Sequence, residues 1–206
     1  MNKDQFIQTL GSGAGAMGVK LSGEMLEKFF LYFTELKRWN RNVNLVSRKE
    51  PDWVRAHFLD SLAPLGMGLV PKDGRAVDLG AGAGFPGVPL GLVSAGLFLD
   101  LAEASGKKCV WLKHLLRILG MEQCTVLEGR FGALLDQGAA GIYDLAVSRA
   151  AAQPAKVVKE ARSFMRPGGR LLIYTTNNLA GKSMGKIHPY AIPGSKIPSV
   201  IWEVTF

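Results

Sequence analysis

Two different spacings of hydrophobic residues divide the chain. In residues 23–42 apolar side chains recur every three or four positions, the spacing of one helix face, and Ser22 is placed to cap that helix. Residues 51–65 repeat this spacing after a proline, which is tolerated in the first turn of a helix. An N-terminal helical segment of residues 1–72 is therefore predicted, with a flexible turn at the glycine-rich stretch 11–18.

From Arg75 onward, short apolar runs of strand length alternate with segments of helix length. This alternation predicts an α/β domain at residues 73–206, with a doubly wound, mostly parallel sheet. The final stretch, 190–206, has a Pro-Gly turn followed by β-forming residues and predicts a strand or hairpin that closes the sheet edge. The predicted buried strands are 76–80, 97–103, 124–129, 143–148 and 170–175, and the clearest helices are 106–120 and 151–169.

No charged residue lies between Asp78 and Asp100, an interval long enough for a membrane span. Six glycines and two prolines within it make a continuous helix unfavourable. The interval is predicted instead as a strand, a glycine loop, a helix and a second strand. It is then a ligand-binding loop inside a sheet.

The composition suits one core, because 48% of the 206 residues are hydrophobic and 20% are charged. The net charge of +8 is uneven: residues 151–206 hold eight Lys or Arg and two acids, whereas residues 61–150 hold equal numbers. Basic ends around a neutral centre favour a polyanionic partner, although a basic surface that only keeps the protein soluble gives the same count.

Two further features bear on the class of protein. Cys109 and Cys124 lack the spacing of metal ligands and lie in apolar segments, so we expect buried free thiols and no metal site. The first ten residues lack the basic and then apolar pattern of a secretory signal, so we expect a cytoplasmic protein.

The glycine loop has two interpretations. Gly82, Gly84 and Gly87 satisfy the G-x-G-x-x-G pattern of dinucleotide-binding loops. That pattern uses backbone N–H groups to bind a pyrophosphate, and Pro86 and Pro89 remove donors from this loop. A ligand without phosphates fits the loop better, and a NAD enzyme is the weaker alternative.

An acid two residues before three alternating glycines resembles the first motif of class I S-adenosylmethionine-dependent methyltransferases. Residues 143–147 and 165–173 resemble the fourth strand of that fold and the helix-turn-strand that leads into the fifth. The resemblance implies that the glycines let the backbone approach the methionine part of the cofactor, and that Glu103 accepts hydrogen bonds from both ribose hydroxyls. The motif residues are Asp78, Gly80, Gly82 and Gly84.

A narrower resemblance extends from about residue 20 to Phe206. Its motifs are RWNRNVNLVS (38–47), HFLDSL (57–62), VDLGAGAGFPGVPL (77–90), GKK followed by WL (106–112) and SRA (148–150). They resemble the ribosomal RNA small subunit methyltransferase G family, also called glucose-inhibited division protein B. The resemblance implies a seven-stranded sheet and methyl transfer from S-adenosylmethionine to N7 of one guanine in the decoding region of 16S ribosomal RNA. The implied partner is that RNA or the small ribosomal subunit, and we expect a monomer.

The resemblance also implies cofactor contacts, and the chain departs from the family in three places. Family members usually have an acidic pair in place of Phe131-Gly132, so a backbone contact to the adenine is expected here. The Leu-Lys-Gly that commonly ends the fifth strand in this family is replaced here by Tyr174-Thr175-Thr176. Lys182 or Lys186 is expected to replace the missing RNA-facing lysine. The arginine before the family's histidine is replaced by Ala56. The implied cofactor residues are Gly80, Phe85, Arg130, Phe131, Gly132 and Arg149.

Arg149 follows the predicted fourth strand and is the leading catalytic candidate. Guanine N7 has a lone pair and no proton to lose, so the reaction needs positioning and charge stabilisation rather than a base. A permanently protonated arginine can hold the cofactor carboxylate or orient the guanine, although an ion pair with a structural acid is the alternative. His57 and Asp60 lie three residues apart on a predicted helix and are candidates to line the guanine pocket, with helix packing an equal alternative.

Basic residues near two predicted helix ends are candidate RNA contacts. Lys107 and Lys108 begin a helix, where their charge opposes the helix dipole and suggests a phosphate site, although solvated lysines are an equal alternative. Arg38 and Arg41 flank Trp39, which is expected to be a buried anchor rather than a base-stacking surface. Two other functions stay open: a class I methyltransferase with a different acceptor, and a catalytically silent RNA-binding relative.

Overall fold

The computed structural model describes residues 1–149, 153–175, 185–195 and 198–206. Four helical segments come first, strands then alternate with helical segments from β1 to β5, and two more strands follow in the described residues. The elements are α1 (Lys3–Ala16), α2 (Gly23–Trp39), the π-helix η1 (Val54–Leu59), α3 (Asp60–Gly66), β1 (Asp73–Leu79), α4 (Gly87–Val93), β2 (Gly96–Glu103), α5 (Gly106–Leu119), β3 (Cys124–Glu128), α6 (Phe131–Leu134), the π-helix η2 (Leu135–Ala139), β4 (Tyr143–Arg149), α7 (Pro154–Ala161), β5 (Met165–Thr175), β6 (Lys186–Tyr190) and β7 (Ser199–Thr205).

Within the described ranges, seven strands form one sheet in the order β3-β2-β1-β4-β5-β7-β6. The first five strands pair in parallel, whereas β7 runs antiparallel to both of its neighbours. The predicted doubly wound, mostly parallel sheet is confirmed. The strand predicted in 190–206 is β7, whereas its edge partner β6 comes mostly from residues before that stretch. The direction of winding reverses between β1 and β4. Open sheets of this kind bind ligands at the carboxyl ends of their strands, beside such a reversal.

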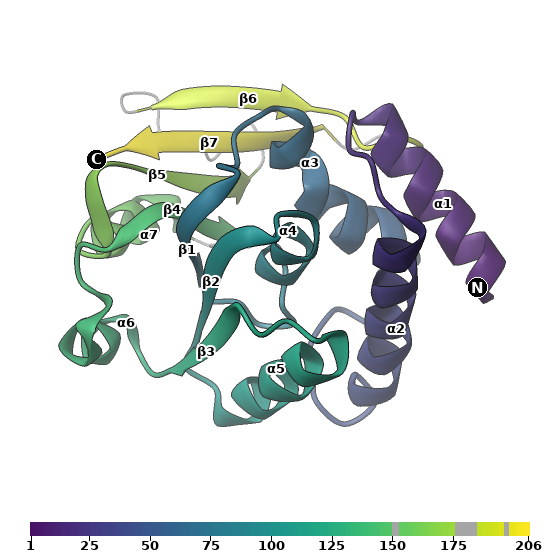
Figure 1. Cartoon of the computed structure of the whole chain (residues 1–206), viewed down its shortest axis with the longest axis horizontal. Coiled ribbons are helices and arrows are strands. Elements are labelled where there is room, and N and C mark those ends of the chain that lie inside the picture. The colour runs from purple at the N-terminus through teal and green to yellow at the C-terminus, as the bar shows by residue number, and fades with distance from the viewer. Residues whose placement is uncertain (150–152, 176–184, 196–197) are drawn as a thin grey trace.

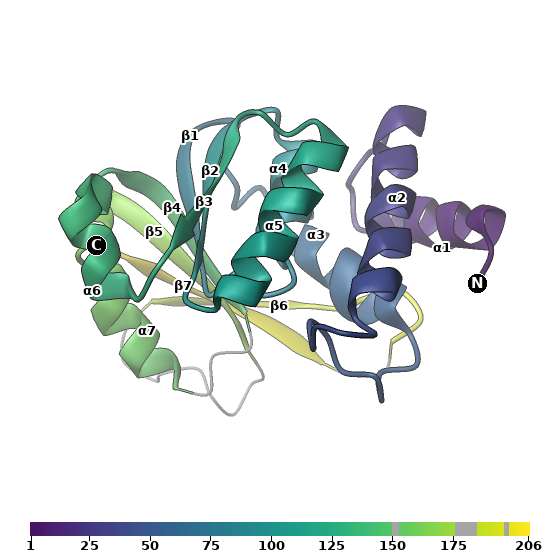
Figure 2. The ribbon, with the colours of Figure 1, turned by 90° about the horizontal axis from the view of Figure 1, so that it is seen from below.

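Helices cover both faces of the sheet (Figure 1). One face is covered by α6 and α7 and the other by α4 and α5, with α1 and α2 in an outer layer beyond α4 and α5 (Figure 2). In the part of the chain that the structure describes, no helix is long and apolar enough to cross a membrane. The charge-free stretch forms β1, a glycine loop, α4 and β2, as predicted.

Aromatic rings connect the outer helical layer to the glycine loop. Phe6 of α1 lies 5.5 Å from Phe58 between ring centroids, and Phe58 lies 5.1 Å from Phe85 of the loop. Tyr32 of α2 stacks on Phe85 at 5.0 Å. The predicted buried thiols, Cys109 and Cys124, are confirmed. The helices before β1 therefore share a core with the sheet and help to fix the loop after it.

The predicted flexible turn at 11–18 is wrong, because α1 continues through it to Ala16. Glycines are poor helix formers, and their number in this stretch suggested a turn. Packing decides the conformation instead. Leu10, Gly13 and Ala14 are buried, and a Cβ atom at Gly13 would lie 2.5 Å from a methyl carbon of Leu59. The small residue lets α1 approach η1 closely.

Two alanine substitutions in α1 separate packing from helix propensity. Gly13→Ala places its methyl group against Leu59, and we expect a loss of about 1–3 kcal/mol in the free energy of unfolding. Gly15→Ala, the matched control, meets nothing within 4 Å and is expected to stabilise the protein by about 0.5–1 kcal/mol. Urea unfolding of both variants measures the difference. Equal effects would contradict the close packing of α1 on η1.

The predicted helix at 151–169 is too long. In the described residues α7 ends at Ala161, and β5 already begins at Met165. Phe164 is fully buried in the second core cluster, and Gly168 adopts a positive φ of 80°. The pairing of β5 with β4 changes register after Met165, so the Pro-Gly-Gly segment forms an irregularity within the strand rather than a helix end.

Candidate cofactor and catalytic site

The loop after β1 is held open by its glycines. Gly80, Gly82 and Gly84 adopt φ angles of 82°, 56° and 103°, which favour glycine. A Cβ atom at Gly80 would meet nothing within 4 Å, and one at Gly82 would meet only a carbonyl oxygen at 3.7 Å. At Gly84, however, it would lie 2.8 Å from the Tyr32 hydroxyl. The first two glycines therefore face open space, and the third packs against α2.

Two buried side chains fix the middle of this loop. The Tyr32 hydroxyl and the Trp111 indole N–H both donate to the carbonyl oxygen of Ala83, at 2.8 and 2.9 Å. Tyr32 comes from α2 and Trp111 from α5, so two helices hold one backbone group. The loop is preorganised for a ligand, which lowers the entropy lost on binding.

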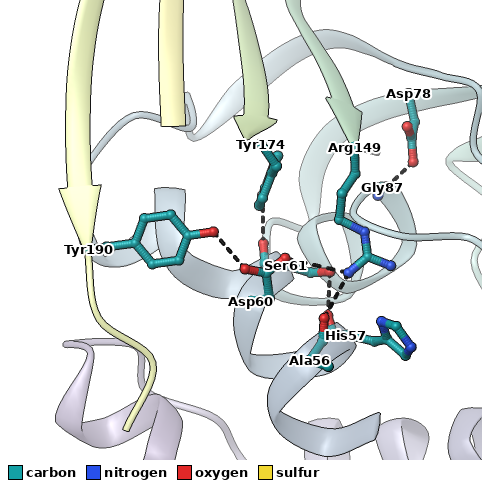
Figure 3. A network of polar contacts seen from close by, with 9 residues as sticks. All are labelled: Ala56, His57, Asp60, Ser61, Asp78, Gly87, Arg149, Tyr174 and Tyr190. Carbon is teal, nitrogen blue, oxygen red and sulfur yellow. Dashed lines mark hydrogen bonds and ion pairs between the residues drawn. The ribbon is translucent and has the colours of Figure 1, made fainter. Parts of the chain in front are cut away.

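Asp78 lies beneath the loop, fully buried at the end of β1. Its Oδ2 accepts a hydrogen bond from the Gly87 N–H at 2.8 Å, which ties β1 to the first residue of α4 (Figure 3). In the described residues, its Oδ1 has no hydrogen-bond partner. Burial raises the pKa of Asp78 to about 7, and the Gly87 N–H and Arg149 oppose this rise only partly. The predicted motif acid is thus a buried acceptor with one unused oxygen.

This raised pKa predicts how the stability of the cofactor-free protein depends on pH. Between the unfolded pKa near 4 and the folded pKa of about 7, only the folded state holds the proton, so raising the pH destabilises it. From pH 5 to 8 we expect the wild type to lose on the order of 2–3 kcal/mol relative to Asp78→Asn. Urea unfolding of both proteins at each pH measures this difference. Parallel pH curves would show that Asp78 is ionised in the folded state throughout.

Glu103 ends β2 beside the loop. Its Oε2 accepts the Gly82 N–H at 2.9 Å, and its Oε1 accepts the Ser105 N–H at 2.8 Å. A carboxylate oxygen has a second lone pair, so both oxygens can still accept a hydrogen bond from a ligand. The half-buried carboxylate is therefore oriented toward the loop by two backbone donors.

Arg149 extends from the end of β4 toward η1 and α3 (Figure 3). Its Nη1 donates to the carbonyl oxygen of Ala56 at 3.1 Å and lies 3.4 Å from Oδ2 of Asp60. Its guanidinium also lies 4.9 Å from the centre of the Phe85 ring. Among the described residues, Nη1 alone of its nitrogens has an acceptor. The ion pair is present, and the remaining guanidinium donors are available to a ligand.

Asp60 joins Arg149 to the C-terminal hairpin. Its Oδ1 accepts the Tyr190 hydroxyl at 2.6 Å, while Oδ2 faces Arg149 (Figure 3). Burial raises the pKa of Asp60, and Arg149 and Tyr190 oppose that rise. Tyr174 of β5 donates to the carbonyl oxygen of Ser61 at 3.0 Å, which fixes α3 against the sheet. The carboxylate thus orients the arginine while the hairpin orients the carboxylate.

His57 lies on η1 with its ring stacked on Phe85 at 5.3 Å. Burial, and secondly the charge of Arg149, lower the pKa of His57 to about 4, so the ring is neutral at neutral pH. Neither ring nitrogen has a hydrogen-bond partner among the described residues. An imidazole of this kind can donate to or accept from a base without adding charge. His57 of η1 and Arg149 both lie against the Phe85 ring, and Asp60 of α3 pairs with Arg149.

The turn predicted to contact the adenine follows β3 at the same edge of the sheet. Gly129 donates its N–H to the carbonyl oxygen of Glu103 at 3.0 Å. The turn that starts at Arg130 therefore lies near the end of β2. The Phe131 ring packs on Phe164 at 6.0 Å, within the second core. Gly132 is exposed. The backbone of this turn, rather than the Phe131 ring, is available to a ligand.

The predicted RNA contacts have different surroundings. Lys107 and Lys108 lie in the first turn of α5, near Glu103, and have no acidic partner in the described chain. Arg41 is exposed, whereas Arg38 pairs with Glu35 at 2.7 Å. Trp39 packs on Trp111 at 5.5 Å, as expected of an anchor.

The structure does not support a replacement of the missing family lysine by Lys186. Its partner across the hairpin is Glu203, which pairs with Leu172, three residues before the end of β5. Lys186 therefore lies away from the carboxyl edge of the sheet. Lys182 and Thr176 lie outside the described residues. Arg55, the arginine nearest to Ala56, instead donates to the carbonyl oxygen of Pro193 at 2.9 Å and pairs with Asp52.

Sequence reasoning missed Tyr190 and the position of Phe85. Tyr190 lay in a stretch predicted only as an edge strand, and its partner Asp60 is 130 positions away. Phe85 was expected in the loop, but its ring is buried between Tyr32, His57, Phe58 and Arg149. No local pattern predicts either contact, because both depend on how distant segments pack.

The fold and the site together define a class of protein. Open space above Gly80 and Gly82 and the carboxylate of Glu103 fit a ligand with hydroxyl groups that lies against the loop, such as S-adenosylmethionine. TYW2 of M. jannaschii, solved in complex with AdoMet, has the same fold: TM-score 0.53 at 11% identity, over 67% of this chain and 70% of that one. The chain therefore has the fold of the class I S-adenosylmethionine-dependent methyltransferases.

Sequence comparisons identify the family. The family model described as rRNA small subunit methyltransferase G matches residues 25–184. A protein of that name from Roseiflexus castenholzii is 33% identical over 205 residues, 91% of this chain and 86% of the relative. Another, from Stenotrophomonas maltophilia K279a, is 35% identical over 195 residues, 90% of this chain and 88% of the relative. The chain belongs to the rRNA small subunit methyltransferase G family.

Proposed function

We propose that the chain transfers a methyl group from S-adenosylmethionine to N7 of one guanine in 16S ribosomal RNA, in the decoding region of the small subunit. The observation that carries this proposal is the position of Arg149. It stands at the end of β4, beside the reversal of the sheet, and its neighbours are a neutral histidine and a paired carboxylate. We propose that the protein acts as a cytoplasmic monomer.

The residues divide between two ligands. Gly80 and Gly82 give the methionine part of the cofactor close access to the backbone, and Glu103 holds the ribose. The backbone of residues 130–132 contacts the adenine. Bound S-adenosylmethionine supplies the activated methyl group. Asp78 acts from beneath by fixing the loop to α4.

The catalytic residues orient the guanine and do not remove a proton from it. Guanine N7 has a lone pair and carries no hydrogen, so a general base is unnecessary. His57 is neutral and unpaired in the described structure, and it can form a hydrogen bond with the base. Arg149 remains protonated and uses its free donors on the guanine or on the cofactor carboxylate. Asp60 holds Arg149 in place.

The test is methyl transfer from radiolabelled S-adenosylmethionine to small ribosomal subunits from a strain that lacks this gene. We expect label at N7 of a single guanine in 16S RNA, identified by mass spectrometry. Label on another base or molecule would overturn the proposed acceptor and leave the methyltransferase class intact. Cofactor binding without any transfer to RNA or subunits would favour a catalytically silent relative.

A further inference from the structure

We propose that a basic hollow between residues 44–49 and the start of α5 binds the sugar-phosphate backbone of the RNA substrate. The hollow has a volume of about 760 Å³. This inference rests on the proposed function, because it takes RNA as the substrate. It extends the phosphate contact expected at Lys108 to a hollow whose other wall, residues 44–49, the sequence did not place beside it. The hollow is lined by Asn44, Leu45, Val46, Ser47, Arg48, Lys49 and Lys108.

Buried Asn40 gives the segment that lines the hollow a fixed shape. Its Oδ1 accepts the N–H groups of Leu45 and Val46 at 2.8 and 3.0 Å, and its Nδ2 donates to the carbonyl oxygen of Val46 at 3.1 Å. Arg48 donates to the carbonyl oxygens of Asn40 and Arg41, at 2.9 and 2.8 Å. The wall is therefore preorganised, and an anion binding there orders little additional chain.

The charge of the hollow is not neutralised by the protein. None of its lining residues is acidic, and Lys49 and Lys108 have no carboxylate partner in the described residues. Arg48 uses carbonyl oxygens, so its full charge remains. Many basic residues elsewhere are paired: Arg38 with Glu35, Arg55 with Asp52, Arg75 with Asp100, Lys113 with Glu128, and Arg170 with Glu203. Unpaired cations are what a phosphate backbone requires.

The start of α5 strengthens the preference for an anion. This 14-residue helix has no side-chain cap at Ser105 and no acid in its first turn. Its dipole and Lys108 therefore place positive charge on the same side of the hollow. Lys108 follows Glu103 by five positions, so the hollow adjoins the carboxyl edge of the sheet where the cofactor is held.

Two further hollows share lining residues in series, and the last is lined by Asp60, the partner of Arg149. Arg48 also lines a second hollow of about 390 Å³, together with Lys37. Glu50 and Asp52 line both that one and a third, of about 380 Å³, which reaches Asp60. These two hollows contain the carboxylates of Glu50, Asp52 and Asp60, so they suit an uncharged base and not the phosphate backbone. We infer that the backbone is held at Lys49 and Lys108 while the target base reaches Arg149.

The test compares two double variants, each of which removes two positive charges. Lys49→Gln/Lys108→Gln removes two cations from the hollow. It leaves Arg48 in place, because Arg48 also holds the backbone of Asn40 and Arg41. Lys72→Gln/Arg117→Gln is the matched control, because both residues are exposed, have no ion pair in the described structure and lie at the opposite edge of the sheet. KM and kcat for small ribosomal subunits are measured at several KCl concentrations and constant Mg²⁺, and the Kd for S-adenosylmethionine is measured by calorimetry.

For Lys49→Gln/Lys108→Gln we expect KM to rise on the order of tenfold at 0.1 M salt, with kcat and the cofactor Kd unchanged. The slope of log KM against log salt should fall by about 1.4–1.8, the loss of two phosphate contacts. The control should match the wild type. If Lys49→Gln/Lys108→Gln had the same KM and the same salt slope as the wild type, this inference would be overturned. Methylation by the wild type would still support the proposed function. A weakened cofactor Kd would also overturn it, by assigning the hollow to the cofactor.

Discussion

Arg149→Ala should reduce kcat/KM for methylation of small ribosomal subunits by roughly 100- to 1000-fold, the range measured when one preorganised donor is removed from an active site. The substitution removes the only guanidinium at the end of β4 and the cation that lies over Phe85. The cofactor Kd distinguishes its two roles. A weakened Kd means that Arg149 holds the cofactor carboxylate, and an unchanged Kd means that it orients the guanine.

The fold should survive this substitution. Asp60 loses Arg149 but keeps the Tyr190 hydroxyl as a hydrogen-bond donor. Circular dichroism and urea unfolding check this point. If Arg149→Ala unfolds, the double variant Arg149→Ala/Asp60→Asn also removes the Asp60 carboxylate that has lost its partner. The same loss of activity is then measured in the double variant. Near-wild-type activity in a folded variant would remove Arg149 from the site.

Most of the sheet could be predicted because its signals are local. A buried parallel strand is an apolar run bounded by turns, and the runs at 76–80, 97–103 and 143–148 gave β1, β2 and β4. The errors arose where packing outweighed propensity. Gly13 of α1 is favoured by the close approach of Leu59, and the helix predicted at 151–169 ends early because Phe164 and Met165 enter the core.

The part of the candidate site that comes from short continuous motifs could be predicted from the sequence. The glycine loop and Glu103 follow consecutive strands, so their meeting at one edge of the sheet follows from the parallel topology. The network of Arg149, Asp60 and Tyr190 joins three distant segments, and its hydrogen bonds span 89 and 130 positions. The basic hollow likewise depends on the fold of residues 44–49 around Asn40, for which the sequence has no periodic signal.

Gly82→Leu should abolish cofactor binding while leaving the fold nearly intact. The protein itself leaves room for the new side chain, since a Cβ atom at Gly82 meets only a carbonyl oxygen at 3.7 Å. The leucine would then fill the space that we assign to S-adenosylmethionine, and we expect its Kd to weaken at least roughly 100-fold, a loss of about 2.7 kcal/mol or more. The positive φ of 56° adds a strain of about 1–2 kcal/mol in the folded state.

Gly120→Leu is the matched control for that strain. Gly120 ends α5 with a φ of 65°, and a Cβ atom there also meets nothing within 4 Å. It lies at the far end of α5 from Glu103, so it carries the same conformational cost without approaching the cofactor. Because a ligand that binds only the folded state raises Tm, S-adenosylmethionine should raise the Tm of the wild type and Gly120→Leu but not that of Gly82→Leu. An equal Tm shift in both variants would place the cofactor away from the glycine loop.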